Sequence, residues 1–540
     1  MREFDVCIVG SGAGGSPIAY ELSRAGFSVV VLEKGNYLNE NDFNKDELSV
    51  SRRSIYLPSQ NDEYHMVNDG ESIQKTSADG WNFWNGNIVG GSSNLMSGYF
   101  HKMRESDFKL KSKYGSIEGA NIVDWPISLK ELEPYYKKVV DVVGVSGEGM
   151  ELNALAENGS TAWFDRACKK LNYTSVITPR AILSSAREGR SSCYYSNFCG
   201  SYGCSSGAKG SSRASLLNVA LKTNKLTILA NSFVYKLDSN SSGKVTLAHY
   251  YDKANKSQTI KAKIFVVSAQ AHESVRLLLN SKGKYAPNGL GNENNQVGRN
   301  LIFSAGGSGE GRFELDNLSK SEQIALMQRG AFFNRSLTQW HEYKDNGTLY
   351  KGGVIDFLFE HANPIAKSMR SLYDDRGNIS WGVALQKRIH DSFTKSKILT
   401  YEVFNDWLPT DKCYVDVDQS NKDKWGVNVG RINLNAHEHD LRVGNFLAQK
   451  SENVLKEMGA VDISRSISSS PPANLIAGGC RFGNEAKNSV LDRNCKVHDM
   501  QNLYVVDASF MPTGGSVPFT WTIYANSFRV ADEILRNLRS

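Results

Sequence analysis

The chain has 540 residues, of which 40% are hydrophobic and 22% charged, and a formal net charge of +6. A chain of this length is too long to fold around one hydrophobic core, so we expect a globular protein of two or more domains. The mild charge, with Lys and Arg scattered along the chain, argues against a nucleic-acid partner, and no apolar run is long enough to span a bilayer.

The cysteines and the N-terminus bear on the compartment. Eight cysteines in a chain of this length do not make a disulfide framework. The first residues already belong to a folded unit, with no charged and apolar leader before them. We therefore expect a cytoplasmic protein.

The N-terminus carries a glycine-rich turn between a predicted strand and a predicted helix. Residues 5–9 are apolar and β-branched, which predicts a buried strand, and a helical pattern follows the turn. In the turn, Gly10, Gly12 and Gly15 have the spacing in which the first glycine makes a tight turn and the second admits a pyrophosphate. The third lets the helix pack closely on the strand. The N-terminus of such a helix attracts phosphate.

A second strand completes this unit. Residues 28–32 are again apolar and β-branched, and they end in Glu33, about twenty residues past the glycines. An acidic residue at that place can bond a ribose hydroxyl. Strand, turn, helix, strand and acid together predict a dinucleotide site.

The remaining elements are expected in chain order as follows. Residues 36–80 are polar and predicted to be irregular, and 81–108 are dense in glycine and serine, typical of a backbone that lies against a ligand. Further patterns predict helices over 129–144, 273–279 and 520–535, and strands over 226–237, 245–251, 259–268, 354–359, 398–404, 414–417 and 502–507. The middle third therefore predicts a separate antiparallel domain, and the fold class is α/β.

Six segments, taken in order, resemble one family. They read GSGAGGSPIAYELSRAG, VGGSSNLMSG, DWPISLKELEPYY, VVSAQAHESVRLLL, VGRNL and NLYVVDASFMPT. Together they resemble the glucose–methanol–choline (GMC) oxidoreductases, nearest the bacterial FAD-dependent sugar and polyol dehydrogenases. The resemblance implies a Rossmann-type FAD-binding domain from residues 1–160, 190–305 and 465–540. An antiparallel-sheet substrate domain would span 306–464.

The resemblance implies FAD rather than NAD. Some relatives carry a histidine, covalently bonded to the flavin, where this chain has Asn94 and Leu95, so non-covalent FAD is implied. The residues expected to bind the cofactor are Gly10, Gly12, Ala13, Gly14, Gly15, Glu33, Lys34, Gly90, Gly91, Ser92, Ser93, Asn94, Val234, Asp507, Ala508 and Thr520.

The chain departs from the family at the catalytic positions. Where the family keeps a histidine as general base this sequence has Leu475, and where it keeps a second His or Asn it has Pro518. Neither side chain can accept a proton or donate a hydrogen bond. Loss of a general base typically costs about two to four orders of magnitude in rate.

Three interpretations of this departure are open. Another residue supplies the base, and Asn474, Arg481, Tyr524 and Asn526 are near in sequence although none is a good base. Alternatively, the substrate carries its own activation, such as an amine lone pair or an acidic C–H, and simple alcohols and sugars are poor donors. Or catalysis is lost and the chain is a flavin-retaining electron-transfer subunit. The candidate catalytic positions are Leu475, Pro518, Asn474, Trp521 and Tyr524. An apolar pocket formed by Leu475, Phe482, Pro518, Phe519 and Trp521 would suit a hydrophobic substrate better than a sugar.

One loop gathers three cysteines, Cys193, Cys199 and Cys204. Soft thiolates suit iron, and the dehydrogenase branch resembled here carries an iron–sulfur cluster on such a loop. The alternative is free or disulfide-bonded thiols.

The expected partners are a small-molecule substrate and an electron-acceptor protein. The predicted function is a two-electron dehydrogenation by FAD, of a small, apolar or self-activated substrate. The alternatives are a conventional GMC alcohol dehydrogenase or oxidase with a relocated base, and a non-catalytic flavoprotein.

Overall fold

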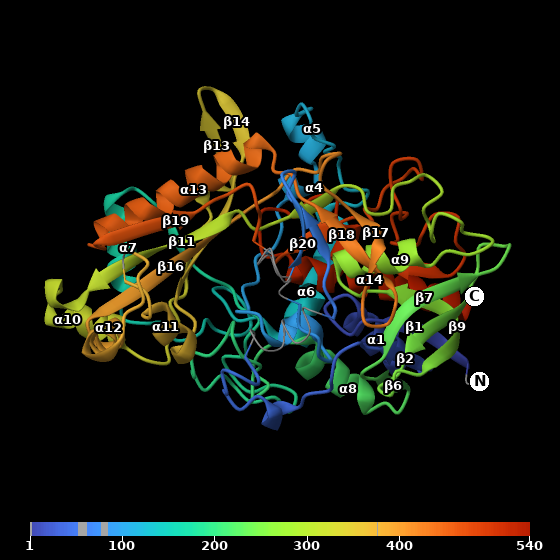
Figure 1. The fold of residues 1–540 in the computed structure, drawn as a ribbon, viewed down its shortest axis with the longest axis horizontal. Coiled ribbons are helices and arrows are strands. Elements are labelled where there is room, and N and C mark those ends of the chain that lie inside the picture. The colour runs from blue at the N-terminus through green and yellow to red at the C-terminus, as the bar shows by residue number, and fades with distance from the viewer. Residues whose placement is uncertain (1–2, 52–61, 77–84, 375, 473) are drawn as a thin grey trace.

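The structure is a computed structural model that describes residues 3–51, 62–76, 85–374, 376–472 and 474–540. Two large sheets lie on opposite sides of the molecule (Figure 1). The chain therefore has the α/β fold class that the sequence predicts. No helix in the described ranges is both long and apolar enough to cross a membrane.

The first sheet has seven strands, and both chain termini lie near it (Figure 1). Its order is β6-β2-β1-β9-β8-β7, with β21 beside β9. The strands are β1 (Glu3–Val9), β2 (Val29–Leu32), β6 (Leu226–Leu229), β7 (Phe233–Ser239), β8 (Val245–Tyr251), β9 (Ser257–Val267) and β21 (Leu503–Val505). The strands β6, β2, β1, β9 and β21 are parallel and mostly buried, which explains their continuous apolar runs.

The predictions for this unit are largely confirmed. The strand expected over 5–9 is β1, and α1 (Gly15–Arg24) follows the glycine turn. The single strand predicted over 226–237 is wrong, because the chain turns at Asn231, which has a φ of +53°, and forms β6 and β7. The C-terminal helix α14 (Thr520–Arg539) packs against α1 and α6 (Leu129–Val139).

The second sheet has six strands in the order β19-β11-β16-β15-β12-β5 and is antiparallel throughout. Its strands are β5 (Ser175–Ile177), β11 (Gly307–Glu314), β12 (Arg335–Leu337), β15 (Gly353–Phe359), β16 (Ser396–Asn405) and β19 (Asp462–Ser466). One face is covered by α13 (Glu438–Glu457), and side chains such as Tyr401 and Val403 pack there into a core with Leu447. The antiparallel middle region is thereby confirmed.

Smaller strand pairs complete the described part of the fold. These are β3 (Met66–Asn68) with β4 (Ile73–Lys75), β17 (Tyr414–Lys422) with β18 (Asn428–Asn433), β10 (Leu301–Phe303) with β20 (Ile476–Gly478), and β13 (Glu342–Asp345) with β14 (Thr348–Lys351). β18 pairs with β3, so part of the stretch predicted as irregular is strand. β17 and β18 also pack against α9 (Ala271–Asn280) of the first unit. The domain boundaries stay a prediction.

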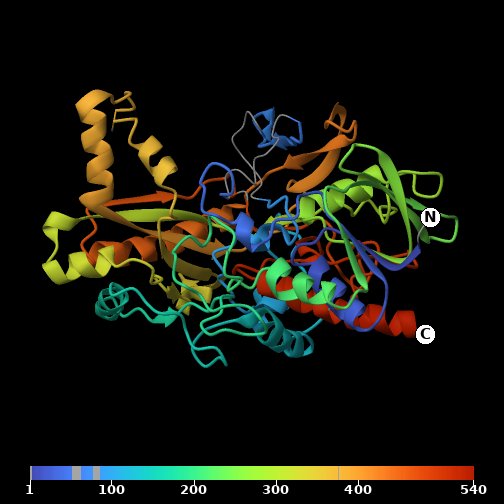
Figure 2. The same ribbon diagram turned by 90° about the horizontal axis from the view of Figure 1, so that it is seen from below.

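Seven further α-helices lie in the described ranges. They are α4 (Glu105–Phe108), α5 (Leu110–Tyr114), α7 (Thr161–Lys170), α8 (Asn218–Leu221), α10 (Lys320–Met327), α11 (Pro364–Arg370) and α12 (Gly382–Thr394). Figure 2 shows α11 and α12 projecting from the second sheet. Neither of these two helices contains a buried residue.

Candidate functional site

The glycine turn after β1 has the geometry that its spacing predicts. Gly10 has a φ of +95°, and a Cβ there would lie 2.3 Å from the carbonyl oxygen of Ser268. A Cβ at Gly15 would lie 2.2 Å from the carbonyl oxygen of Gly10, so helix and strand touch at this residue. A Cβ at Gly12 would meet no heavy atom within 4 Å. Gly12 therefore faces open space, which suits a bound pyrophosphate.

Glu33 holds this turn in place. Its carboxylate accepts hydrogen bonds from the Ser11 backbone N–H at 3.1 Å, the Ser11 hydroxyl at 2.6 Å and the Gly35 N–H at 2.8 Å. Burial raises the pKa of Glu33, although these donors favour the charged form. The same Ser11 hydroxyl accepts a bond from the Gly90 N–H at 2.8 Å, so the carboxylate connects both glycine-rich segments.

One cavity runs past most of the predicted cofactor residues. The turn at Gly12, Glu33 directly after β2, and Asp507 directly before the short helix η7 (Ala508–Phe510) all face it. Of the predicted residues, the lining includes Gly10, Gly12, Ala13, Gly14, Glu33, Lys34, Gly91, Ser92, Ser93, Val234, Asn474, Leu475, Asp507, Ala508, Pro518 and Thr520. The fold thus gathers segments from both ends of the chain around a single elongated space.

The part of the cavity lined by Tyr99, Glu402, Phe404, Leu475 and Pro518 is called the far end here. Tyr99 lies close to Glu402, whose charge helps to raise the pKa of the tyrosine, although burial is the larger cause. Leu475 has a φ of +50°, in the left-handed region that a leucine seldom adopts. The far end joins the first unit to the second sheet, because Glu402 and Phe404 belong to β16.

Five predicted residues lie behind the cavity wall rather than on it. Among the residues that the structure describes, Gly15, Gly90, Asn94, Trp521 and Tyr524 are absent from the lining. The Asn94 amide donates to the carbonyls of Val89 at 3.0 Å and Gly91 at 2.9 Å. The Trp521 indole donates to the Tyr136 carbonyl at 3.1 Å, and the hydroxyls of Tyr524 and Ser212 are 2.8 Å apart. These side chains support the wall, and their predicted roles in the reaction stay predictions.

Asp507 is tied down where β21 ends. Its carboxylate accepts hydrogen bonds from the Ser274 hydroxyl, from the Gln270 N–H at 3.1 Å and from the Ser509 N–H at 2.9 Å. Burial raises the pKa of Asp507, and the three donors oppose that shift. The residue therefore fixes the start of α9 against the turn that continues towards Pro518.

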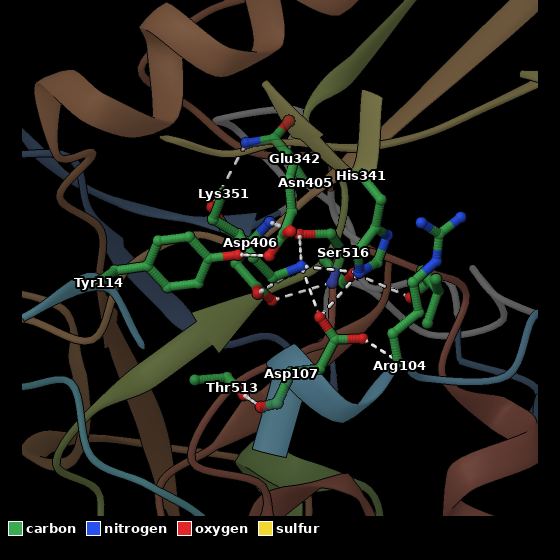
Figure 3. Close-up of polar contacts among 12 residues, drawn as sticks. Arg104, Asp107, Tyr114, His341, Glu342, Lys351, Asn405, Asp406, Thr513 and Ser516 are labelled. Carbon is green, nitrogen blue, oxygen red and sulfur yellow. Dashed lines mark hydrogen bonds and ion pairs between the residues drawn. The ribbon is translucent and has the colours of Figure 1, made fainter. Parts of the chain in front are cut away.

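A buried charge cluster beside α4 was missed by the sequence analysis (Figure 3). The Lys351 ammonium lies 2.7 Å from an oxygen of Asp107, and His341 Nε2 lies 2.8 Å from the same oxygen. Lys351 also donates to the Ser516 hydroxyl at 3.0 Å, and the Ser516 N–H donates to Asp406 at 3.2 Å. The cluster therefore anchors the loop that leads into Pro518, from positions with no shared sequence motif.

A second charge cluster borders the other part of the cavity. Glu273 lies 2.8 Å from His65 Nε2, and Arg276 lies 2.5 Å from Asp423. Ligand atoms of His65, His272 and Glu273 all lie within 4.8 Å of one another. Burial and the neighbouring His65 lower the pKa of His272 well below its usual range. The positive charges of Lys34 and Arg276 lower this pKa further, whereas Glu273 acts in the other direction. Both cations have a carboxylate partner, since Lys34 lies 3.0 Å from Glu63 and Arg276 pairs with Asp423.

The three cysteines of the loop lie together around one lysine. Cys193, Cys199 and Cys204 are partly buried against a small apolar cluster, and each one favours the charged form of the buried Lys209 ammonium. Burial raises the pKa of the Cys193 thiol to about 11, whereas Lys209 helps to lower the pKa of Cys204. Among the described residues, these sulfurs do not form a triad within 4.8 Å of one another. The loop thus lacks the tight convergence of a single-ion site.

Comparisons with known proteins point in one direction. Two family models described as GMC oxidoreductase match residues 64–304 and 409–527, and an NAD(P)-binding Rossmann-like domain matches residues 8–62. The 2-methyl-1,2-propanediol dehydrogenase of Mycolicibacterium austroafricanum is 28% identical, with 98% of this chain and 95% of the relative covered. The fructose dehydrogenase large subunit of Gluconobacter japonicus is 25% identical, with 99% and 98% covered.

A further relative and a solved structure agree with these matches. The paromamine 6'-oxidase of Streptomyces fradiae is 28% identical over 100% of this chain and 92% of the relative. A solved formate oxidase variant from Aspergillus oryzae has a TM-score of 0.64 at 14% identity, covering 99% of this chain and 98% of its own. At that identity the structural match shows the fold alone.

Proposed function

Because this chain belongs to the GMC oxidoreductases and is an FAD-dependent oxidoreductase of that family, we propose that it oxidises a small, largely apolar substrate by two electrons. A plain sugar fits the site less well. The observation that carries this proposal is the far end of the cavity, where Leu475, Pro518, Phe404 and Phe519 present hydrocarbon surface. A sugar hydroxyl buried against these apolar side chains would lack a partner there and would cost free energy, and Tyr99 and Glu402 could serve only some of the hydroxyls of a sugar.

The proposed FAD site uses the residues that line the rest of the cavity. The turn at Gly12 and the segment Gly91, Ser92 and Ser93 would hold the pyrophosphate, and Val234 would lie against the adenine. When bound, FAD supplies the chemistry by accepting two electrons from the substrate as a hydride. Non-covalent binding is proposed because the buried Asn94 amide is turned to backbone carbonyls and the side chain is no nucleophile.

The cysteine loop carries a separate proposal about electron transfer. If Cys193, Cys199 and Cys204 hold an iron–sulfur cluster, the anaerobically purified protein should contain about three or four iron atoms and sulfides per chain. Such a cluster would pass electrons to an acceptor protein. Iron at trace level only would leave free thiols as the correct interpretation.

The proposed substrate class is tested by anaerobic reduction of the bound flavin, followed by its absorbance. We expect an apolar compound to reduce the flavin with a second-order rate constant at least about tenfold above that of glucose or fructose, equal to about 1.4 kcal/mol in the transition state. Hexylamine serves as the self-activated donor, and 1-hexanol and 2-methyl-1,2-propanediol serve as simple alcohols. Sugars that react as fast as these compounds would contradict the apolar site. Failure of every compound would favour the non-catalytic electron-transfer subunit.

A second candidate has a specific observation in its favour. Simple alcohols are expected to be poor donors only if no other residue accepts the proton that Leu475 and Pro518 cannot accept. Glu402 lines the same far end and carries a carboxylate. An apolar alcohol, oxidised with a relocated base, is therefore the second candidate.

A further inference from the structure

The segment that contains α11 and α12, residues 364–394, is called the α11–α12 hairpin here. Of the 15 large hydrophobic residues that are exposed in the described part of the chain, seven lie on this hairpin. We propose that the hairpin docks the protein on the surface of a bilayer that contains anionic phospholipid. The proposal goes beyond the proposed function and does not depend on it.

Folding does not account for these apolar side chains. Neither α11 nor α12 contains a buried residue, and no residue of the hairpin belongs to the described core under α13. The side chains of Trp381, Val383 and Ile379 are 81%, 80% and 68% exposed. Apolar side chains gathered on one exposed surface mark a place that a partner or a membrane covers.

The most exposed of these residues belong to the tip of the hairpin. Figure 2 shows the connection between α11 and α12 projecting away from the second sheet. In this connection Tyr373 and Ile379 are paired across an isolated antiparallel bridge, and a turn lies between them. Trp381 and Val383 follow where α12 begins. The hairpin therefore presents an apolar tip built from an aromatic pair and two aliphatic side chains.

The shape of this tip favours a bilayer over a protein partner. Protein interfaces have complementary packed cores, and two copies of this chain would have to pack one projecting tip against an identical one. Side chains that are four-fifths exposed on a projection need a partner that surrounds them, and a fluid bilayer surrounds whatever enters it. Trp and Tyr are also the residues that favour the headgroup level, whereas aliphatic side chains reach the acyl boundary.

The charges of the hairpin select the kind of lipid. Residues 364–394 contain five Lys and Arg and three Asp. Arg370 ends α11, Arg376 lies in the turn and Lys387 lies one helical turn after Val383, and all three cations are exposed. Although Arg370 and Lys387 also contact carboxylates, exposed pairs of this kind are weak. Long cationic side chains beside an apolar tip can reach lipid phosphates, so anionic phospholipid is the fitting surface.

The hairpin is fixed at its base. The Glu47 carboxylate accepts hydrogen bonds from the Ile365 N–H at 2.7 Å and the Ala366 N–H at 2.9 Å. The Asn363 amide donates to the Ser201 hydroxyl at 3.0 Å. At the other end α12 leads directly into β16, which lines the far end of the cavity. Docking therefore gives the cavity a defined orientation to the bilayer, in which apolar compounds dissolve.

The test is cosedimentation of the FAD-loaded protein with vesicles of phosphatidylcholine and phosphatidylglycerol. The wild type should bind, and the double variant Ile379→Ser, Trp381→Ser should have a partition constant at least about tenfold lower. The matched control is Ile324→Ser, since Ile324 of α10 is 63% exposed and lies outside the hairpin. It should bind like the wild type. FAD content and unfolding midpoint should be unchanged in both variants, because neither removes a buried side chain.

The charge contribution is measured separately. Arg376→Gln and Lys387→Gln should each lower the partition constant on the mixed vesicles about fivefold. On vesicles of phosphatidylcholine alone the two variants should match the wild type. Added salt should weaken the binding of the wild type to the mixed vesicles, because it screens exposed charges.

A quenching measurement shows whether the tip enters the lipid. Brominated phosphatidylcholine in the mixed vesicles should quench more tryptophan fluorescence in the wild type than in Trp381→Phe, which should still bind. A wild type that binds neither kind of vesicle would overturn the proposal, as would an equal loss of binding in Ile324→Ser. A dimer in solution that requires Trp381, with no vesicle binding, would assign the tip to a second copy of the chain and would also overturn it.

Discussion

The glycines of the first turn belong to one sequence motif, but they have different structural roles. Gly15 is packed from three sides, by Gly10, Ser268 and Ile8, whereas Gly12 faces the cavity with no heavy atom within 4 Å of a built Cβ. The space at Gly15 is filled by the protein itself. The space at Gly12 is available to a ligand, so a side chain there competes with the cofactor and not with folding.

The two glycines therefore predict opposite outcomes on substitution with alanine. Gly12→Ala should leave the unfolding free energy of the FAD-free protein unchanged and weaken FAD binding at least about tenfold, or about 1.4 kcal/mol. Gly15→Ala should destabilise the FAD-free protein by about 1–3 kcal/mol through overpacking. Urea unfolding and FAD titration of both variants measure these effects, and a destabilised Gly12→Ala apoprotein would contradict the assignment.

The loop that ends at Pro518 is anchored by side chains from other elements. Asp107, His341 and Lys351 are all buried, and Lys351 joins them to Ser516. His341 and Lys351 together hold the pKa of Asp107 well below its usual range, against the effect of burial. Burial lowers the pKa of His341 to about 4, although Asp107 acts in the other direction. The imidazole is therefore neutral in the folded protein near pH 7.

This cluster predicts a loss of stability in mild acid. Between about pH 6.5 and 4 the unfolded chain protonates His341 and the folded chain does not, so stability is complete above 6.5 and falls as the pH drops. From pH 7 to pH 5 the wild type should lose about 2 kcal/mol more than His341→Gln. Urea unfolding at both pH values measures this. His390→Gln, at an exposed histidine, is the control, and equal losses in wild type and His341→Gln would contradict the prediction.

At the scale of the molecule, the cavity lies where two separately formed sheets face one another. Its walls come from the glycine turn at one extreme of the chain, from β16 in the middle and from the segment before α14 at the other. Bound FAD would therefore contact both units at once. Binding to the folded state alone stabilises a protein in proportion to the logarithm of ligand concentration.

FAD should accordingly be removable and should stabilise the whole chain. Denaturation should release all flavin into the supernatant, since Asn94 offers no covalent link. Refolded apoprotein at 100 times the dissociation constant of FAD should gain about 2.7 kcal/mol in unfolding free energy. Thermal unfolding with and without FAD measures the gain, and AMP serves as a control that reaches only part of the cavity. Flavin retained on precipitated protein would contradict non-covalent binding.

The first unit and the family could be predicted from the sequence alone. Strand, turn, helix and acid between residues 3 and 33 follow from local pattern and glycine geometry, which neighbouring residues decide. The same is true of the substitution at Leu475 and Pro518, since the flanking motif fixes the alignment. In the second sheet, β15 and β16 were predicted as strands, whereas β5, β11, β12 and β19 were not. The pairing of these strands could not be predicted either, because pairing over long separations leaves no periodic signal.

The surroundings of Leu475 and Pro518 depend on packing between distant segments and could not be predicted from the sequence. Glu402 reaches the far end because the register of β16 turns it away from the core, and the segment at Ser304 holds it near Leu475. Asp107 and Lys351 meet because distant elements bury them in one place, where opposite charges must pair. A site built from side chains of separate elements depends on how those elements pack together. No local sequence pattern predicts that packing.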